Sequence, residues 1–516
     1  MVPTQCLGRR TSTSLPNAPL LVELQPPRTL SDMIDMRTPC IALQAPLTPQ
    51  EKVRTIRDSL PKHLFRSVLN SQEPVAWRIS PEPFPLSPQT LAAIESLGDD
   101  LALFLRMLGR LYARSVKGTA PAFIAEYLEA GKPEFIVNLA RHNRFSGDIP
   151  GVIRPDLILT ENGVIACEID SVPGGMGVVG AMTHAYSAVG FETVGGRHGM
   201  REGLSTMLKS LTRTERPTVA VVVSDECGDY RGELTWMANE ISELGICDAY
   251  VCAPQDIVFS KEVLSVQLGD GREEIIDVLY RNFELFDLLN VPKSELMLYA
   301  ARHGRVKMTP SPRTVMEEKL SFALLHHPRL AMLWSKELGE STFGRLRALF
   351  PQTWILDPRP VPPQASINGL DIAGEPVNDW MQLAKLGRRK RDYVVKPSGF
   401  SELAWGSRGV RIAKALNKEA WEACLHDGLA AYPQTPHILQ RFHEGRRVKV
   451  SYVDAPTQRL EPLDGRVRLC PYYFVVGGGK TQLGGILATI VPTNKLLIHG
   501  MSEAVMAPCY VQENGY

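Results

Sequence analysis

The stretch IRPDLILTENGVIACEIDSVPGGMGVVG, from Ile153 to Gly180, decides the fold of this chain. Two runs, Val152–Thr160 and Val164–Asp170, have the composition of strands and alternate apolar with polar residues. Between them stands Glu161-Asn162-Gly163, a short turn sequence with glycine where a positive φ is wanted. The spacing predicts a β-hairpin with a three-residue turn centred on Asn162.

The predicted register brings four charged side chains together. Asp156 falls opposite Glu168, and Arg154 falls opposite Asp170. Since residues two apart on a strand share a face, three carboxylates and one arginine meet on one face of the hairpin. An amphipathic hairpin with a solvated face is the simpler interpretation, but facing carboxylates repel one another and a solvated face rarely gathers three. Carboxylate oxygens in this arrangement suit Mg²⁺, which prefers a few carboxylates together with nucleotide phosphates.

The composition is that of a globular protein. The 516 residues are 44% hydrophobic and 22% charged, with a net charge of +1. This length allows about two to four domains with large cores. The near-neutral charge gives no electrostatic reason to expect nucleic acid or an anionic membrane as partner, and the absence of a long apolar run predicts no membrane span. Nine scattered cysteines without a C-x-x-C pair favour reduced thiols and a cytoplasmic location.

The sequence pattern divides the chain into four parts. Residues 1–50 contain many Pro, Ser and Thr and predict a mostly disordered segment. Residues 51–215 predict a helical region followed by the hairpin. Residues 216–305 predict a strand, a helix and a second strand, which is a β-α-β unit of a parallel sheet, and residues 306–516 become β-rich. The predicted elements before residue 330 are helices at Leu91–Val116, Gly180–Gly190, Tyr230–Leu244, Lys293–His303 and Thr314–Leu325, and strands at Thr218–Val223, Asp248–Cys252 and Val278–Arg281.

A lysine and a glycine-rich loop stand out in the β-rich part. Lys396 ends the apolar strand Tyr393–Pro397, and the loop SGFSELAWGSRGV that follows has Gly399, Gly406 and Gly409. A lysine at a strand end beside such a loop can hold phosphate oxygens. A snorkelling lysine beside an ordinary hairpin loop is the alternative interpretation. Further strands, expected to form a second sheet, are His437–Phe442, Arg447–Asp454, Arg466–Val476 and Gly485–Ile490.

Two glycine-rich stretches resemble phosphate-binding motifs but lack the required context. Gly175-x-Gly177-x-x-Gly180 fits the dinucleotide fingerprint, yet the strand before it ends in charged residues and Pro173. Gly477-Gly478-Gly479-Lys480-Thr481 would need a glycine in place of Phe474 to be a Walker motif. Neither stretch is therefore interpreted as a nucleotide site.

The hairpin and the lysine strand resemble a known enzyme family. Arg154-x-Asp156, the Asn-Gly turn, Glu168-x-Asp170 and Pro173-Gly174-Gly175 resemble the metal-binding hairpin of ATP-grasp ligases. Lys396-Pro397 with its glycine loop resembles their nucleotide-covering hairpin, and Gln440 in HILQRF resembles the strand that lines the adenine. The acidic hairpin precedes the lysine strand here, an order similar to that of the circularly permuted branch, of which glutathionylspermidine synthetase is the best-known member.

The resemblance covers residues 150–180 and 275–500 and implies an α/β (α+β) fold. The expected architecture is an ATP-grasp fold in circularly permuted order, with a helical N-terminal region and a β-α-β parallel-sheet subdomain like a pre-ATP-grasp domain. Residues 51–215 would carry the metal-binding hairpin, and residues 306–516 would form the nucleotide-binding region. Asp170 stands where the family usually has asparagine, which still supplies a metal oxygen but adds a negative charge.

The same resemblance implies an ATP- and Mg²⁺-dependent carboxylate–amine ligase, which acts through an acyl phosphate on small-molecule or peptide substrates. Arg154 would stabilise the transferring phosphate and the tetrahedral oxyanion, and Mg²⁺ would be held by Asp156, Glu168 and Asp170. Two alternatives stay open: a nucleotide-binding protein of this fold without ligase activity, and a phosphotransferase that uses the same site. The implied ATP ligands are Lys319, Lys396, Ser398, Gly399, Gly406, Gly409 and Gln440.

Overall fold

The computed structural model describes residues 46–64, 77–362, 365–500 and 502–513. The chain divides into two units, and every element described below belongs to the second, Leu47–Tyr516. The segment predicted to be disordered therefore lies almost entirely outside the described residues. Among the helices that the structure describes, none is long and apolar enough to span a membrane.

The predicted hairpin forms as β2 (Val152–Thr160) and β3 (Gly163–Asp170). Arg154 pairs with Asp170 and Asp156 pairs with Glu168, which confirms the predicted register. The predicted three-residue turn is wrong, because Thr160 pairs directly with Gly163 and leaves only two residues in the turn. A bulge at Cys167, between the paired residues Ala166 and Glu168, supplies the extra residue that restores the predicted pairing.

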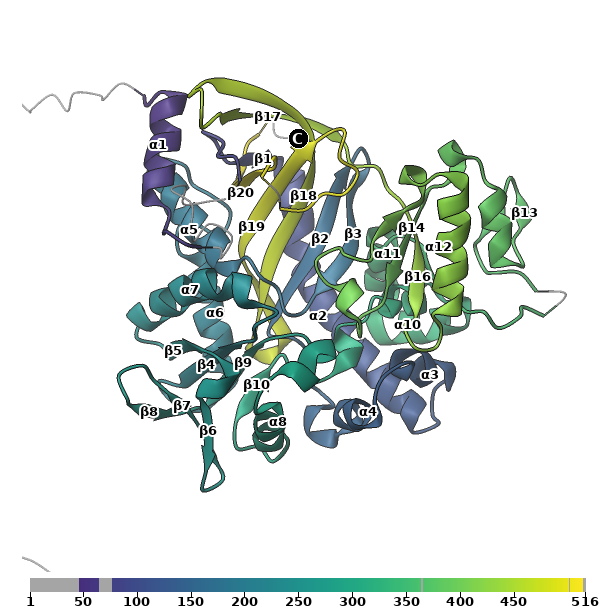
Figure 1. Ribbon diagram of the computed structural model, residues 1–516, viewed down its shortest axis with the longest axis horizontal. Helices are drawn as coiled ribbons and strands as arrows, with labels where there is room; N and C mark the ends of the chain where they lie inside the picture. Colours follow the sequence, from purple (N-terminus) through teal and green to yellow (C-terminus); the bar gives the residue numbers. More distant parts are fainter. Residues whose placement is uncertain (1–45, 65–76, 363–364, 501, 514–516) are drawn as a thin grey trace, which may run out of the picture. The chain divides into compact units, whose positions relative to one another are not determined.

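The hairpin is one edge of a seven-stranded sheet (Figure 1). The long strand β18 (Leu460–Val476) pairs with β2 on one side and with β19 (Lys480–Pro492) on the other. Strands more than 300 residues apart in the chain therefore meet in one sheet. The remaining strands are β17 (Arg447–Val453), which pairs with β18, and β20 (Val505–Val511) and β1 (Phe84–Leu86) beyond β19.

Helices cover both faces of this sheet. The helix α2 (Pro88–Val116) shares one apolar core with Leu469 and Ile486, and it confirms the helix predicted from residue 91. The helices α5 (Met176–Ser187) and α6 (Gly199–Ser210) share a second core with residues of the opposite face, such as Tyr472. Leu157 packs in the core that contains α2. Since successive side chains point to opposite faces of a strand, Arg154 and Asp156 lie on the other face of the sheet, the one covered by α5 and α6.

A second, four-stranded antiparallel sheet contains the lysine strand β14 (Tyr393–Pro397). Its neighbours are β16 (His437–Arg441) and β15 (Arg411–Ile412), and α12 (Lys418–Ala430) packs against it. The prediction that all four late strands share one sheet is wrong. Only β16 joins β14. The other three belong to the large sheet, because β2 offers β18 a pairing edge that no local pattern reveals, and β17 and β19 pair with β18. The fourth strand of this sheet is β11 (Thr353–Ile355).

The predicted β-α-β unit is confirmed. The strands β4 (Thr218–Val223) and β5 (Asp248–Cys252) are parallel and are joined through α7 (Arg231–Glu243). Two further parallel strands, β9 (Val278–Asn282) and β10 (Lys307–Thr309), complete this sheet. A small antiparallel sheet that the sequence analysis missed follows β5 and consists of β6 (Ile257–Ser260), β7 (Val263–Gln267) and β8 (Glu273–Ile275).

The predicted helix Thr314–Leu325 is broken in the structure. A short 3-10 turn covers Thr314–Met316, and α9 (Leu320–His326) begins only after Glu317, Glu318 and Lys319. This break matters for the site because Glu317 and Lys319 line a pocket described below. The remaining helices are α1 (Pro49–Ser59), α3 (Phe123–Glu129), α4 (Glu134–Arg141), α8 (Ser294–Arg302), α10 (Ala331–Leu338) and α11 (Glu340–Leu349), and the last two strands are β12 (Asp371–Ile372) and β13 (Glu375–Pro376).

Candidate active site

The charged face of the hairpin forms one wall of a cavity of about 490 Å³, the charged pocket. Strand β18 supplies Arg468 and Cys470, and Tyr230 closes another side. This volume is typical of small-molecule sites. The carboxylic acid, lysine and arginine side chains that line the charged pocket are Arg154, Asp156, Glu168, Asp170, Glu284, Glu317, Lys319 and Arg468.

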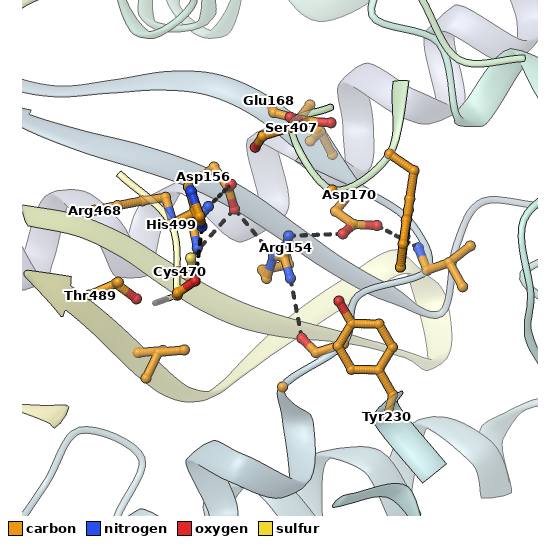
Figure 2. A pocket seen from close by; sticks show the side chains of 18 of the residues that line it. Arg154, Asp156, Glu168, Asp170, Tyr230, Ser407, Arg468, Cys470, Thr489 and His499 are labelled. Carbon is orange, nitrogen blue, oxygen red and sulfur yellow. Dashed lines mark hydrogen bonds and ion pairs between the residues drawn. The ribbon is translucent and has the colours of Figure 1, made fainter. Parts of the chain in front are cut away.

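Arg154 lies between two of the predicted metal ligands (Figure 2). Its Nη2 is 2.8 Å from Oδ2 of Asp170, and its Nε is 3.3 Å from Oδ1 of Asp156. Its Nη1 also donates to the carbonyl of Gly174 at 3.2 Å. These contacts hold Arg154 against the hairpin from which it projects.

The other carboxylates of the hairpin are paired with cations from distant parts of the chain. Arg468 Nη1 lies 2.8 Å from Oδ2 of Asp156, and Lys319 Nζ lies 2.7 Å from Oε1 of Glu168. Across the pocket, Glu317 pairs with Arg281, whose side chain is fully buried. Each of these four carboxylates, Asp170 included, therefore has a cation partner.

Glu284 differs from the four paired carboxylates. Among the described residues it is the one carboxylate of the charged pocket that has no ion pair within 4.0 Å. Burial raises its pKa well above the ordinary value, and nearby Glu317 and Asp170 raise it further. A cation that enters the charged pocket would therefore be attracted to Glu284.

The environment shifts the hairpin carboxylates in opposite directions. Burial alone would raise the pKa of Asp156, but Arg468 and Arg154 together lower it below its ordinary value. Burial raises the pKa of Asp170, and Arg154 only partly offsets this effect. Burial would lower the pKa of Lys319, but Glu168 raises it overall. The two neighbouring carboxylates therefore differ: the arginines favour the ionised form of Asp156, whereas burial disfavours the ionised form of Asp170.

A second cavity of about 100 Å³, the apolar pocket, lies beside the lysine strand. Lys396 Nζ donates to Oε1 of Gln440 and to the carbonyl of Cys167, both at 2.9 Å. Gln440 in turn donates to the hydroxyl of Thr353 at 3.3 Å. The hairpin bulge thus contributes the Cys167 carbonyl to this network. The apolar side chains that line the pocket are Ile158, Ile165, Val394, Val410, Ile412, Phe442, Leu496, Leu497 and Ile498.

The two cavities are joined. Asp156, Glu168, Ser407 and Arg468 line both of them. We call this group the junction. The predicted metal ligands Asp156 and Glu168 therefore stand where the apolar pocket opens into the charged pocket.

The glycine-rich loop covers the charged pocket with part of its length. Gly399 and Gly406 line the charged pocket, whereas Gly409 packs against Pro397. Ser398, expected to contact ATP, lies outside both pockets. Its hydroxyl donates to Glu318 and accepts from the backbone N–H of Leu320 at 3.1 Å, so it fastens the loop to the start of α9.

A metal ion at the hairpin would have to share the carboxylates with Arg154, Arg468 and Lys319, which are paired with them. Among the residues described, no three His, Cys, Asp or Glu side chains form a ready metal cage. Mg²⁺ nevertheless needs only one or two carboxylates when phosphates and water supply its other ligands. Asp156 and Glu168, opposite each other at the junction, are donors that fit a metal arriving with a nucleotide, and Asp170 lies two residues along the same strand face.

The rejected dinucleotide motif has a different role. The N-terminus of α5, at Gly175, receives the carboxylate of Glu233, which accepts hydrogen bonds from the backbone N–H groups of Gly175 and Val178. Glu233 is completely buried, and burial raises its pKa to about 7. A protein carboxylate thus occupies the position where a helix N-terminus would otherwise hold a phosphate.

Among the lining residues that the sequence analysis did not identify as site residues are Arg468, Glu284, Glu317 and Ser407. Arg468 reaches Asp156 only because β18 pairs with β2, across 312 residues of sequence. The one local signal was the presence of two arginines, Arg466 and Arg468, at the start of the otherwise apolar run Arg466–Val476.

Comparisons with known proteins identify the fold. No protein-family profile matches the chain, and no curated protein sequence does. A glutathione synthetase-like effector from Globodera pallida, solved in its apo form, matches with a TM-score of 0.56 and 11% identity over 90% of this chain and 98% of the effector. A candidate gamma-glutamylcysteine synthetase from Methylobacillus flagellatus KT covers 78% of this chain and 85% of its own, at 10% identity and a TM-score of 0.36.

The match to the effector shows a shared mixed α/β fold. It extends over 90% of the chain, more than residues 150–180 and 275–500 that the sequence resemblance covered. At 11% identity this similarity concerns the fold alone.

Proposed function

We propose that this protein is an ATP- and Mg²⁺-dependent carboxylate–amine ligase with an ATP-grasp fold in circularly permuted order. The observation that carries the proposal is the junction, where an apolar pocket with a buried lysine meets a charged pocket at an acidic hairpin. A nucleotide base suits the first pocket, and phosphates with a polar substrate suit the second. The fold shared with a glutathione synthetase-like protein supports the same class of reaction.

The nucleotide would lie along the lysine strand. The base would be enclosed by the apolar pocket, with Gln440 at its polar edge, and Lys396 would turn from Gln440 toward the phosphates. Lys319 would reach the phosphates from the break before α9. The loop with Gly399, Gly406 and Gly409 would cover them and exclude water, which protects an acyl phosphate from hydrolysis.

Asp156, Glu168 and Asp170 would hold Mg²⁺, which neutralises phosphate charge when it is bound. The chain itself would do the rest by positioning, because phosphoryl transfer needs aligned groups and charge stabilisation more than a protein nucleophile. Arg154 would stabilise charge on the transferring phosphate and on the tetrahedral oxyanion.

In the reaction, a carboxylate oxygen of the donor attacks the γ-phosphorus, and ADP leaves with the electron pair of the bond that breaks. The neutral amine of the acceptor then attacks the acyl carbon, inorganic phosphate leaves with the electron pair of the C–O bond, and the nitrogen gives up a proton to solvent or to the leaving phosphate. The donor and the acceptor would be small molecules or peptides that fit the charged pocket. No nucleic acid or membrane enters this scheme.

A nucleotide-binding protein without ligase activity is the second candidate. It is favoured by the ion pairs of the hairpin, since Asp156, Glu168 and Asp170 each already have a cation partner. In a ligase these pairs must exchange for metal and phosphate. In a binding protein they could remain as they are.

The test is a phosphate-release assay with Mg-ATP and a panel of amino acids, peptides and polyamines. We expect ADP release that requires both a carboxylate and an amine. Release that requires a carboxylate but no amine would identify a phosphotransferase. Nucleotide binding without turnover would favour the binding protein, and release of AMP would contradict the acyl-phosphate scheme.

A further inference from the structure

The junction is the place where a phosphoryl group would change partners. With the base in the apolar pocket and the donor carboxylate in the charged pocket, the transferred phosphorus must lie where the two cavities meet. The residues that line both are Asp156, Glu168, Ser407 and Arg468. Two are carboxylates, which repel phosphate. The remaining two, Arg468 and Ser407, are donors.

Arg468 is the one lysine or arginine, among the described residues, that lines both cavities. Lys319 and Arg154 line the charged pocket only, and Lys396 lines the apolar pocket only. Arg154 is also occupied by two carboxylates and a carbonyl. Lys319 and Arg154 contact the junction carboxylates from the side of the charged pocket, so among the described residues Arg468 is the cation that faces both cavities.

The guanidinium of Arg468 has N–H donors that its ion pair with Asp156 does not use. Its Nη1 lies 2.8 Å from Asp156, while its buried Nε has no hydrogen-bond partner within the described parts of the chain. A guanidinium presents five N–H donors in a planar fork that matches phosphate geometry. If Arg468 turned from Asp156 to a phosphate, Asp156 would keep Arg154 as its partner and become free to bind a metal.

Ser407 approaches the junction from the opposite wall, the glycine-rich loop. Figure 2 shows it next to Glu168, while Arg468 lies beside Asp156. Its φ of 61° lies in the left-handed region, which a non-glycine residue rarely adopts. Such strain is often retained where a side chain must point into a functional site.

We infer that Arg468 and Ser407 form a clamp that holds the γ-phosphoryl group at the junction during its transfer to the donor carboxylate. This role rests on the proposed function. In the step, a bond forms between the donor carboxylate oxygen and phosphorus, the bond from phosphorus to the β–γ bridging oxygen breaks, and ADP takes the electron pair. No proton is transferred. Arg468 and Ser407 donate hydrogen bonds to the non-bridging oxygens before and after the step.

The clamp makes a prediction that does not require turnover. A residue that contacts only the γ-phosphate should affect binding of a nucleoside triphosphate but not of a diphosphate. We therefore compare Mg-AMP-PNP with Mg-ADP by calorimetry. Arg468→Met should weaken AMP-PNP binding about 10- to 100-fold and change ADP binding by less than about threefold. Ser407→Ala should weaken AMP-PNP binding by about three- to tenfold, since it removes a neutral donor.

Two further variants make the test specific. Arg468→Lys keeps a cation beside Asp156 and protects the fold, and it should bind AMP-PNP with an affinity between those of wild type and Arg468→Met. Arg345→Met breaks a comparable ion pair, with Asp100, at a residue that lines neither pocket, and should change neither affinity.

The outcomes separate this inference from the proposed function. If Arg468→Met and Arg468→Lys bind AMP-PNP like wild type, or lose AMP-PNP and ADP equally, the clamp is wrong while the ligase proposal stands. If wild-type protein binds neither nucleotide in the presence of Mg²⁺, the proposed function fails and the clamp fails with it.

Discussion

The two joined pockets hold their lysines in different ways. In the apolar pocket, Lys396 donates to the neutral oxygens of Gln440 and Cys167. In the charged pocket, Lys319 is paired with the carboxylate of Glu168. A ligand that binds Lys396 therefore has to displace only neutral acceptors, whereas a ligand that binds Lys319 has to replace an ion-pair partner.

Because of this difference, we expect the two pockets to have different roles. Burying charges is expensive, and removing one partner of a buried pair leaves the other uncompensated. Exchange in the charged pocket should thus occur only when metal and phosphates arrive together to satisfy both partners. We expect the apolar pocket to determine nucleotide affinity and the charged pocket to determine the rate of reaction.

The largest expected effect is on turnover in Arg154→Lys. This substitution keeps one positive charge for Asp156 and Asp170 but removes the planar fork. If the fork stabilises charge that develops in the transition state, kcat should fall about 100- to 1000-fold, while Mg-AMP-PNP affinity should change by less than about tenfold. Rates are measured with a substrate pair found in the phosphate-release panel.

Arg345→Lys is the matched control for this substitution. Arg345 contacts Asp100 through Nε and Nη2, both at 2.8 Å, and lines neither pocket. It should turn over at the wild-type rate. Wild-type turnover in Arg154→Lys would leave Arg154 a structural ion-pair residue and would remove the catalytic distinction between the pockets.

A smaller effect, on affinity alone, is expected in the apolar pocket. Lys396→Met removes a charge-assisted donor to phosphate, so Mg-ADP and Mg-AMP-PNP should both bind about 10- to 100-fold more weakly. Calorimetry measures both affinities. Lys307→Met, which breaks an ion pair with Asp148 outside both pockets, should leave them unchanged. A Lys396→Met protein that melts early but binds nucleotide normally would show that Lys396 only supports the fold.

Local spacing was sufficient to predict the hairpin and its facing charges. The pairs Arg154–Asp170 and Asp156–Glu168 depend only on the turn and on strand alternation, both of which lie within a stretch of some twenty residues. The predicted pairs form although the turn has two residues and not three. The bulge at Cys167 adds one residue to the second strand and so restores the register. The parallel pairing of β4 and β5 could also be predicted locally, from two apolar strands with a helix between them.

The partners of the hairpin could not be predicted in this way. Strand order depends on which edges meet after the chain collapses, and neither the pairing of β18 with β2 nor the arrival of Arg468 leaves a local pattern. The break before α9 is also invisible, since Glu317, Glu318 and Lys319 are all good helix formers. The local pattern also did not reveal that Ser398, a serine in a phosphate-like loop, lies outside both pockets and donates a hydrogen bond to Glu318.

The smallest expected effect concerns stability and distinguishes the paired carboxylates of the charged pocket from the unpaired one. The pKa of Glu284 is raised in the folded protein, chiefly by burial, above the ordinary value of 4.5. A carboxyl whose folded pKa is raised contributes stability below its unfolded pKa and loses it as the pH rises toward the folded value. Above pH 4.5 the wild-type protein should therefore become progressively less stable than Glu284→Gln, which cannot ionise. We expect similar melting temperatures near pH 4.5 and a melting temperature about 1–3 °C higher for Glu284→Gln at pH 8. Asp156→Asn is the control, with the opposite sign, because Arg468 and Arg154 lower the folded pKa of Asp156, and loss of its charge at pH 8 should lower the melting temperature. Thermal melts of the three proteins at both pH values measure the difference.

If Glu284→Gln gains no stability between pH 4.5 and pH 8, Glu284 titrates in the folded protein as it does in the unfolded chain. The charged pocket would then hold no uncompensated carboxylate, and the attraction of Glu284 for an incoming cation would be lost with it.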